Sequence, residues 1–161
     1  MAENQKKIWI TGASSGIGKA LAEKFALEGW KVAVSARRKE ILDKMSNHEN
    51  IFSYPLDVTM QDQIKENFSK IINDFGNIDL CVFSSGTYDP KLEQGINIQQ
   101  NKFVMETNFF GVLYCIKTVE SYFKNKKNGH ISIVSSIAAY RGLPNSSGYG
   151  PSKAALTNLT E

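Results

Sequence analysis

Short apolar runs alternate along the chain with longer segments in which apolar residues recur at helical spacing. The runs that fit buried strands cover residues 7–11, 31–36, 51–56, 78–84 and 130–136. Helical spacing appears between them at 17–29, 38–46, 60–75 and 98–125, and again from about residue 147 onward. Strands that alternate with helices predict a parallel sheet with helices on both faces. We therefore expect an α/β fold with a doubly wound, Rossmann-like sheet, in a single domain over residues 1–161.

One residue predicts where its strand lies in the sheet. Pro55 falls within the run 51–56. Proline lacks the N–H that a central strand donates to its neighbour, so it is confined to edge strands and strand ends. We therefore expect the third strand, 51–56, at an edge of the sheet.

Composition narrows the classes of function. Of the 161 residues, 42% are hydrophobic and 22% are charged, as is typical of soluble globular proteins. The formal net charge of +3 comes from scattered basic residues, which argues against a nucleic-acid partner. The N-terminus has no signal-peptide pattern, and no apolar run approaches membrane-spanning length. We expect a cytoplasmic protein without a membrane partner.

The two cysteines carry little sign of special chemistry. Cys81 and Cys115 lie in apolar stretches, so we expect buried free thiols, as in a reducing compartment. A disulfide between them is a weaker alternative. We expect no metal site, because His48 and His130 are isolated and do not cluster with the thiols.

The first strand ends in a glycine-rich loop, TGASSGIG, at residues 11–18. Gly12 allows a tight turn, Gly16 lets backbone amides approach a phosphate, and Gly18 lets the next helix pack closely on the strand. The N-terminus of that helix would face the phosphates with its unpaired N–H groups. Because the loop joins the first strand to the first helix, it predicts a dinucleotide site rather than an ordinary flexible turn. The candidate residues are Gly12, Ser14, Ser15, Gly16, Ile17 and Gly18.

The end of the second strand predicts which dinucleotide binds. In an NAD site, an acidic residue at this place binds the ribose 2′-hydroxyl. Here Arg37 and Arg38 stand instead, and Glu40 comes too late. A guanidinium pairs with a 2′-phosphate, which a carboxylate would repel. We therefore predict NADP(H) as the cofactor, with Ser14 and Ser15 as additional donors; the alternative is two ordinary surface arginines.

The stretch YGPSK places Tyr149 and Lys153 four residues apart, so both side chains share one face of a helix. Pro151 between them is tolerated only in the first helical turn, where its missing N–H has no partner to lose. We therefore expect the helix to begin close to Tyr149 and to direct both side chains into the cleft at the carboxyl ends of the strands.

With these motifs in this order, the sequence resembles the short-chain dehydrogenase/reductase family over essentially all 161 residues. The resemblance implies a catalytic set of Asn108, Ser136, Tyr149 and Lys153. It also implies cofactor contacts at Asp57, Val58, Ser84, Gly86, Tyr149 and Lys153. One motif departs from the family pattern: Asn-Asn-Ala-Gly after the fourth strand is here Phe83-Ser84-Ser85-Gly86. The glycine turn is kept, while the asparagine side chains that brace the sheet are lost.

The resemblance implies an oxidoreductase that transfers a hydride between NADP(H) and an alcohol or carbonyl compound. Tyr149 would donate a proton to the carbonyl oxygen, and Ser136 would hold the developing alkoxide. Lys153 would favour the tyrosinate and bind the ribose hydroxyls, and Asn108 would hold a water. The rival interpretation is a catalytically weak NADP(H)-binding or interaction protein.

No motif in the sequence identifies a particular substrate. We expect residues 86–97 and 138–147 to select it, with Tyr140, Leu143 and Pro144 as a partly apolar wall. The resemblance implies a homodimer or homotetramer. The last helical segment reaches Glu161 without a stop signal, and the family's sheet continues past this helix. We therefore expect this chain to be a fragment that lacks the C-terminal strands.

Overall fold

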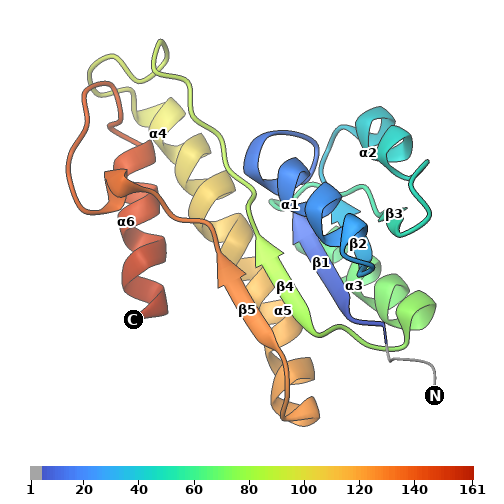
Figure 1. Cartoon of the computed structure of the whole chain (residues 1–161). Helices are drawn as coiled ribbons and strands as arrows, with labels where there is room; N and C mark the ends of the chain where they lie inside the picture. The colour runs from blue at the N-terminus through green and yellow to red at the C-terminus, as the bar shows by residue number, and fades with distance from the viewer. Residues whose placement is uncertain (1–4) are drawn as a thin grey trace.

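The structure, a computed structural model, describes residues 5–161 and contains one five-stranded sheet. Its strands are β1 (Lys7–Thr11), β2 (Lys31–Ser35), β3 (Ile51–Ser53), β4 (Leu80–Phe83) and β5 (His130–Ile133). The spatial order is β3-β2-β1-β4-β5, and all neighbouring pairs are parallel (Figure 1). The direction of winding reverses between β1 and β4. In such sheets, ligands bind beside this switch point, at the carboxyl ends of the strands.

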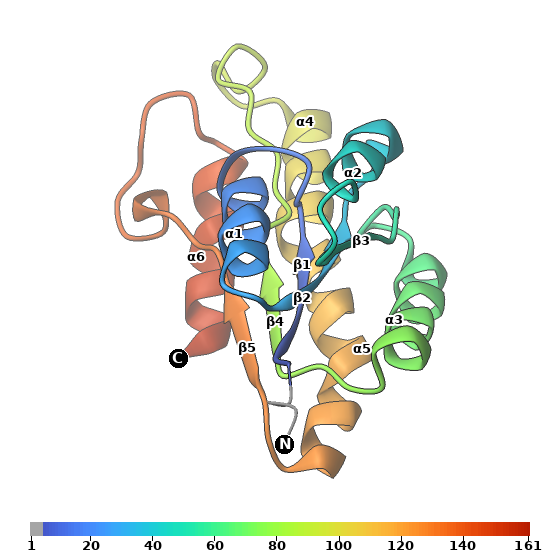
Figure 2. The same cartoon turned by 45° about the vertical axis from the view of Figure 1, so that its right-hand side comes forward.

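Helices cover both faces of the sheet (Figure 2). On one face, α1 (Gly16–Leu27) and α2 (Lys39–Met45) share an apolar cluster with Ile8 and Ile10. On the other, α3 (Gln61–Phe75), α5 (Gly111–Lys126) and α6 (Tyr149–Thr160) contribute to a cluster around Trp9. Successive residues of β1 point to opposite faces, so this one strand supplies both cores. The expected doubly wound α/β fold is confirmed.

Four strands end earlier than the apolar runs that predict them. The runs 31–36, 51–56, 78–84 and 130–136 form strands only as far as Ser35, Ser53, Phe83 and Ile133. The residues that follow each strand belong to loops at the carboxyl edge of the sheet, where they are available for a site. β3 is an edge strand, as Pro55 predicts, and Pro55 itself lies beyond its last paired residue.

The expected helix over 98–125 is present, but it is not α-helical throughout. It consists of α4 (Ile98–Met105), a π-helical turn η1 (Glu106–Phe110) and α5. A π turn holds one residue more than an α turn and often marks a functional site. Asn108, one of the residues implied by the resemblance, lies in this turn and is fully buried.

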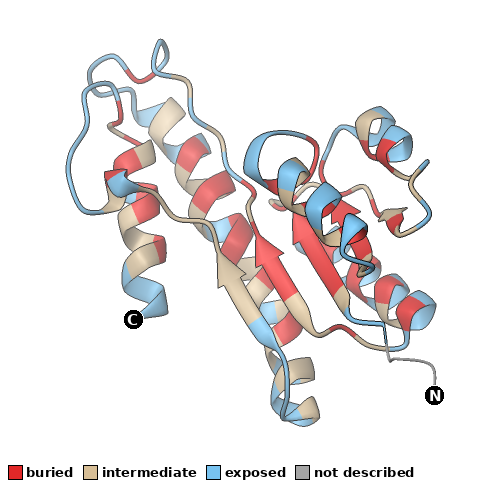
Figure 3. Ribbon diagram, viewed as in Figure 1, coloured by how far each residue is buried: buried red, intermediate tan, exposed pale blue. Residues whose placement is uncertain are grey.

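Burial differs strongly between the central and outer strands (Figure 3). In β1, four of the five residues are buried, whereas no residue of β5 is fully buried and His130 is exposed. Ile131 and Ile133 of β5 pack against the cluster on the α3 and α5 face. The sheet is therefore best covered around β1, β2 and β4.

The cysteines are buried and free, as expected. Burial raises the pKa of the Cys81 thiol and that of the Cys115 thiol, so both resist ionisation. Within residues 5–161, no cluster of three or more histidine, cysteine or acidic side chains is placed to hold a metal ion. No helix over the same residues has the length and apolar character needed to cross a membrane.

Candidate active site

A cavity of about 540 Å³ opens at the carboxyl ends of the strands. We call it the switch-point cavity. The loops after all five strands and the start of α6 line it. Most of the predicted site residues meet there: Gly12, Ser14, Ser15, Gly16, Ile17, Arg37, Arg38, Asp57, Val58, Ser84, Gly86, Tyr149 and Lys153.

The glycines of the first loop have distinct tasks. Gly12 has φ +70°, and a Cβ atom there would lie 2.7 Å from backbone atoms of Ser84 and Ser85. A Cβ atom on Gly18 would lie 2.5 Å from the carbonyl oxygen of Gly12, so Gly18 lets α1 start tightly against this loop and does not itself line the cavity. Gly16 has φ +55° and open space beside it. The loop therefore needs its glycines both for conformation and for close approach.

A guanidinium and two hydroxyl groups form a cluster between the first loop and the end of β2. The Nη2 atom of Arg38 donates to Ser15 Oγ at 2.6 Å and to Ser14 Oγ at 2.8 Å, and Arg38 Nε donates to Ser14 Oγ at 3.1 Å. Arg37 lines the same cavity and is exposed. The sequence does not show which of the two arginines contributes more to cofactor binding. In the structure, Arg38 is the one that forms hydrogen bonds with the two serines.

The loops after β3 and β4 continue the cavity wall. Asp57 Oδ1 accepts hydrogen bonds from the N–H and hydroxyl of Thr59, at 3.0 and 2.9 Å. Ser84 donates its backbone N–H to Thr11 O at 3.3 Å, which ties the start of its loop to β1. A Cβ atom on Gly86 would lie 3.6 Å from Lys153 Nζ, an ordinary contact distance. Gly86 thus borders the lysine.

Tyr149 and Lys153 both point into the cavity from the first turns of α6. Tyr149 is the first residue of the helix and Pro151 the third, so the proline lies in the first turn, as the sequence predicts. Lys153 is only 4% exposed, and its Nζ donates to Val134 O at 2.8 Å. The same atom lies 5.8 Å from the centre of the Tyr149 ring. Burial lowers the pKa of the Lys153 ammonium below its ordinary value.

Asn108 lies behind the cavity rather than in its wall. Its Oδ1 accepts from Thr87 N at 2.7 Å, and its Nδ2 donates to Thr87 O at 3.0 Å and to Ser152 Oγ at 3.1 Å. Ser152 in turn donates to Tyr149 O at 2.7 Å. These bonds connect the loop after β4 to the first turn of α6. Asn108 therefore braces two segments that carry cavity residues.

Ser136 begins the short 3₁₀ helix η2 (Ile137–Ala139), and its hydroxyl accepts from Ala138 N at 3.1 Å. In the chain it stands between Ser135, which lines the switch-point cavity, and Ala138, which lines a second cavity. Ser135 makes a 2.7 Å hydrogen bond between its hydroxyl and that of Thr157. The two adjacent serines thus have different surroundings.

Sequence reasoning missed several residues of the site. Thr87 and Tyr88 line the switch-point cavity directly after Gly86, and the Tyr88 ring lies 4.6 Å from the Tyr149 ring, centre to centre. The sequence places them only within the range 86–97 that is expected to select the substrate, and does not single them out. Ser152 and Ser135 carry no local signal, because the contacts to Asn108 and Thr157 that connect them to other segments are distant in the chain.

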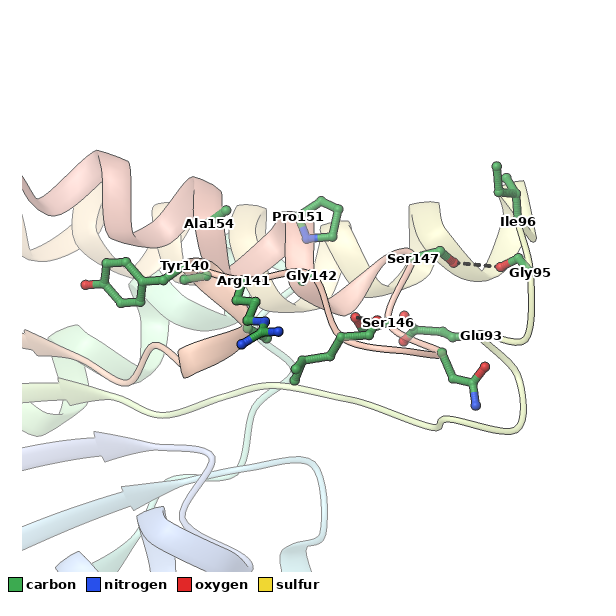
Figure 4. A pocket seen from close by; sticks show the side chains of 15 residues that line it. Glu93, Gly95, Ile96, Tyr140, Arg141, Gly142, Ser146, Ser147, Pro151 and Ala154 are labelled. Atoms are coloured by element: carbon green, nitrogen blue, oxygen red, sulfur yellow. Dashed lines mark hydrogen bonds between the residues drawn. The ribbon is translucent and has the colours of Figure 1, made fainter.

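The second cavity, of about 610 Å³, is open and lies beside the start of α6 (Figure 4). We call it the loop cavity. Residues from 93–96, 138–147 and α6 line it. Tyr140 and Leu143 are among them, as is the buried Glu93. The two loops expected to select a substrate therefore meet around one opening next to Tyr149.

Comparison with known proteins agrees with this geometry. The family model described as short chain dehydrogenase matches residues 6–161. The chain is 34% identical over 163 residues to 11-beta-hydroxysteroid dehydrogenase 1A of Arabidopsis thaliana, covering 97% of this chain and 46% of that protein. It is 34% identical over 157 residues to the 3-oxoacyl-[acyl-carrier-protein] reductase FabG of Thermotoga maritima, covering 94% and 64%. The chain thus spans between about half and two-thirds of these relatives.

Solved structures with a similar fold also include a short chain dehydrogenase. The structure titled "ElxO with NADP Bound" superposes with a TM-score of 0.88 at 29% identity, over 96% of this chain and 65% of that one. A short chain dehydrogenase from Bacillus anthracis superposes with a TM-score of 0.87 at 26% identity, over 98% and 66%. The match to the family model runs through both halves of the switch-point cavity. This chain belongs to the short chain dehydrogenase family.

Proposed function

We propose that the protein is an oxidoreductase that transfers a hydride between NADP(H) and an alcohol or carbonyl compound. One observation carries this proposal. A single cavity has the Arg38, Ser14 and Ser15 cluster at one end and the Tyr149 and Lys153 pair at the other. The first suits a phosphate, and the second suits proton transfer.

The residues present fit NADP(H). The open space at Gly16 and the first N–H groups of α1 suit the pyrophosphate. Arg38, held by two serine hydroxyls, would pair with the 2′-phosphate, with Arg37 beside it. Asp57 and Val58 line the stretch of wall expected to meet the adenine. When bound, the cofactor supplies or accepts the hydride.

The chain itself handles the proton. In the direction of reduction, the Tyr149 hydroxyl donates a proton to the carbonyl oxygen of the substrate. The positive charge of Lys153 stabilises the negative charge that develops on the phenol oxygen as the proton leaves. Ser136 would hold the carbonyl oxygen as it becomes an alkoxide. Asn108 would hold the loop after β4 and the first turn of α6 in a fixed relative position through its hydrogen bonds to Thr87 and Ser152.

The loop cavity would hold the body of the substrate. Tyr140 and Leu143 line it and are exposed, as is Ile96 across the opening. This partly apolar wall favours a nonpolar carbonyl compound. We also propose that the protein associates as a homodimer or homotetramer, which sedimentation of the protein made from its complete coding sequence would test.

The function is tested by an NADPH titration followed by turnover with a panel of small ketones. We expect NADPH binding and NADPH oxidation that depends on a ketone. Tyr149→Phe should lower kcat by roughly 10²–10⁴-fold, because only the proton donor is lost. Its NADPH affinity should stay nearly unchanged.

The rival function is a catalytically weak NADP(H)-binding protein. It would be favoured by tight NADPH binding without turnover of any ketone in the panel. Failure to bind NADPH would overturn both interpretations.

A further inference from the structure

Glu93 is a fully buried acidic residue outside the predicted catalytic set. It belongs to the loop between β4 and α4, and it is 0% exposed. Within residues 5–161, no lysine or arginine forms an ion pair with it. A buried charge is costly unless specific partners compensate it, so this carboxylate requires an explanation.

Its partners are the first amides of α6. Glu93 Oε2 accepts from Gly148 N and from Tyr149 N, both at 2.9 Å. The first amides of a helix have no partner within the helix and attract negative charge. Gly148, which precedes the helix, has no side chain that could cap them. The carboxylate therefore replaces a local cap from 55 residues away.

Further contacts hold the same two segments together. Ser147 Oγ donates to Gly95 O at 2.9 Å (Figure 4). A Cβ atom on Gly148 would lie 3.0 Å from Asn101 Cα, so the start of α6 approaches α4 very closely. The loop that carries Glu93 also carries Tyr88, whose ring packs on the Tyr149 ring. Tyr149 is thus held at its backbone amide and at its ring by one loop.

We propose that Glu93 is a positioning residue for Tyr149. The carboxylate anchors the first turn of α6 to the loop between β4 and α4, and so fixes where the Tyr149 phenol lies in the switch-point cavity. This inference rests on the proposed function, in which Tyr149 is the proton donor. The acceptor oxygen matters most, because Oε2 alone receives both amides while Oε1 is buried without a hydrogen-bond partner among the described residues.

The test compares Glu93→Leu, which removes the acceptor at similar size, with Glu93→Gln, which keeps one oxygen. A misplacement of about 1 Å can cost roughly 100-fold in rate, so we expect kcat of Glu93→Leu to fall by roughly 10- to 100-fold. Glu93→Gln should recover most of that loss. NADPH affinity should stay nearly constant in both, because the Arg38 cluster lies at the other end of the cavity.

Tyr122→Phe is the matched control. The Tyr122 hydroxyl accepts from Ile78 N at 2.9 Å, before the start of β4 and away from both cavities. Removal of this acceptor should lower the melting temperature and leave kcat unchanged. The proposal is overturned if Glu93→Leu keeps the wild-type kcat, if Glu93→Gln is as slow as Glu93→Leu, or if Tyr122→Phe slows turnover equally.

A second readout does not depend on turnover. 3-Fluorotyrosine is incorporated, and the ¹⁹F signal of residue 149 is assigned by its loss in Tyr149→Phe. We expect one sharp signal in the wild type and in Glu93→Gln, and a shifted or broadened signal in Glu93→Leu. An unchanged signal in Glu93→Leu would overturn the proposal even if no ketone were turned over. Absent turnover with the expected ¹⁹F pattern would instead count against the proposed function alone.

Discussion

The switch-point cavity has two ends, which we name after their proposed roles: the phosphate end around Arg38, Ser14 and Ser15, and the catalytic end around Tyr149 and Lys153. The contacts that build them differ strongly in sequence separation. At the phosphate end, Gly18 meets Gly12 within one loop, and Arg38 reaches Ser14 across 24 residues. At the catalytic end, Asn108 reaches Ser152 across 44 residues, and Glu93 reaches Tyr149 across 56. The phosphate end also sits on the buried strands β1 and β2, whereas β5 is only half-buried (Figure 3).

The two ends can therefore fail separately. The phosphate end is formed by consecutive strand-to-helix loops over a well-covered core, so its shape is largely local. The catalytic end depends on the docking of α6 against the loop after β4 and against α4. We expect a substitution at one end to leave the function of the other end intact.

Gly12→Ala should have the largest effect on stability, because Gly12 packs against the loop after β4. In Gly12→Ala the new methyl would overlap backbone atoms of Ser84 and Ser85 at 2.7 Å, at a φ of +70°. Overpacking costs about 1–3 kcal/mol and the left-handed conformation about 1–2 kcal/mol, so we expect a loss of about 3 kcal/mol or more. Urea unfolding measures it.

Gly16→Ala is the control for this effect. It meets the same conformational strain at φ +55° and has open space, so it should lose only about 1–2 kcal/mol. Equal losses in the two variants would show that close approach at Gly12 is unimportant.

The next effect concerns the phosphate end alone. Arg38→Ala should lower the preference for NADPH over NADH by roughly 10- to 100-fold, because a charge-assisted contact is worth about 1.5–3 kcal/mol. Arg37→Ala should have a smaller effect, since Arg38 is the one that the serine hydroxyls hold. Dissociation constants for both cofactors measure this, and kcat at saturating NADPH should change little. A larger effect of Arg37→Ala would reverse the assignment.

The third effect separates catalysis from stability at Lys153. Burial lowers the pKa of its ammonium, so between that lowered value and the ordinary one the unfolded chain binds more protons than the folded chain. The free energy of unfolding should therefore rise with pH across this window. Lys153→Met should abolish turnover, remove this rise, and stabilise the protein near neutral pH by about 1 kcal/mol, because the buried charge is gone.

Lys126→Met gives the contrast. Lys126 Nζ donates to Asp79 Oδ1 at 2.8 Å and to Ile78 O at 2.7 Å, far from the cavity. Its loss should destabilise the protein and leave turnover unchanged. If Lys153→Met were also destabilising, the hydrogen bond to Val134 would outweigh the cost of burial.

The smallest effect concerns the ring that covers Tyr149. Tyr88→Ala removes an aromatic contact worth about 0.5–1.5 kcal/mol, so kcat should fall by roughly 2- to 10-fold. Tyr88→Phe keeps the ring and should behave like the wild type. Comparable losses in both variants would indicate that the hydroxyl, not the ring, matters.

The same contrast explains how far the sequence predicts the molecule. Hydrophobic period and the glycine loop predict the strands, the helices and the phosphate end, because these signals lie in short stretches of sequence. The alternation of strands and helices then predicts the parallel sheet, although β1 and β4 pair over a long sequence separation. The four-residue spacing of Tyr149 and Lys153 places both on one face of a helix, and this signal is also local. The contacts of Glu93 and Tyr88 with Tyr149, and that of Ser152 with Asn108, could not be predicted, because they exist only after α6 has docked. Arg38 could not be ranked over Arg37 from the sequence, because only the folded structure shows that Arg38 is the one hydrogen-bonded to Ser14 and Ser15.

The π turn at Glu106–Phe110 decides where the long helix can change in length. It holds one residue more than an α turn, so loss of one residue here would leave a regular α turn and keep both halves of the helix in their present orientation. The same loss within α4 or α5 would rotate one half against the other by about 100°. Either Val104 would then leave Gly148, or Cys115 and Val119 would leave the sheet. Single-residue deletions that spare Asn108 should therefore be better tolerated in this turn than in the α-helical segments on either side of it.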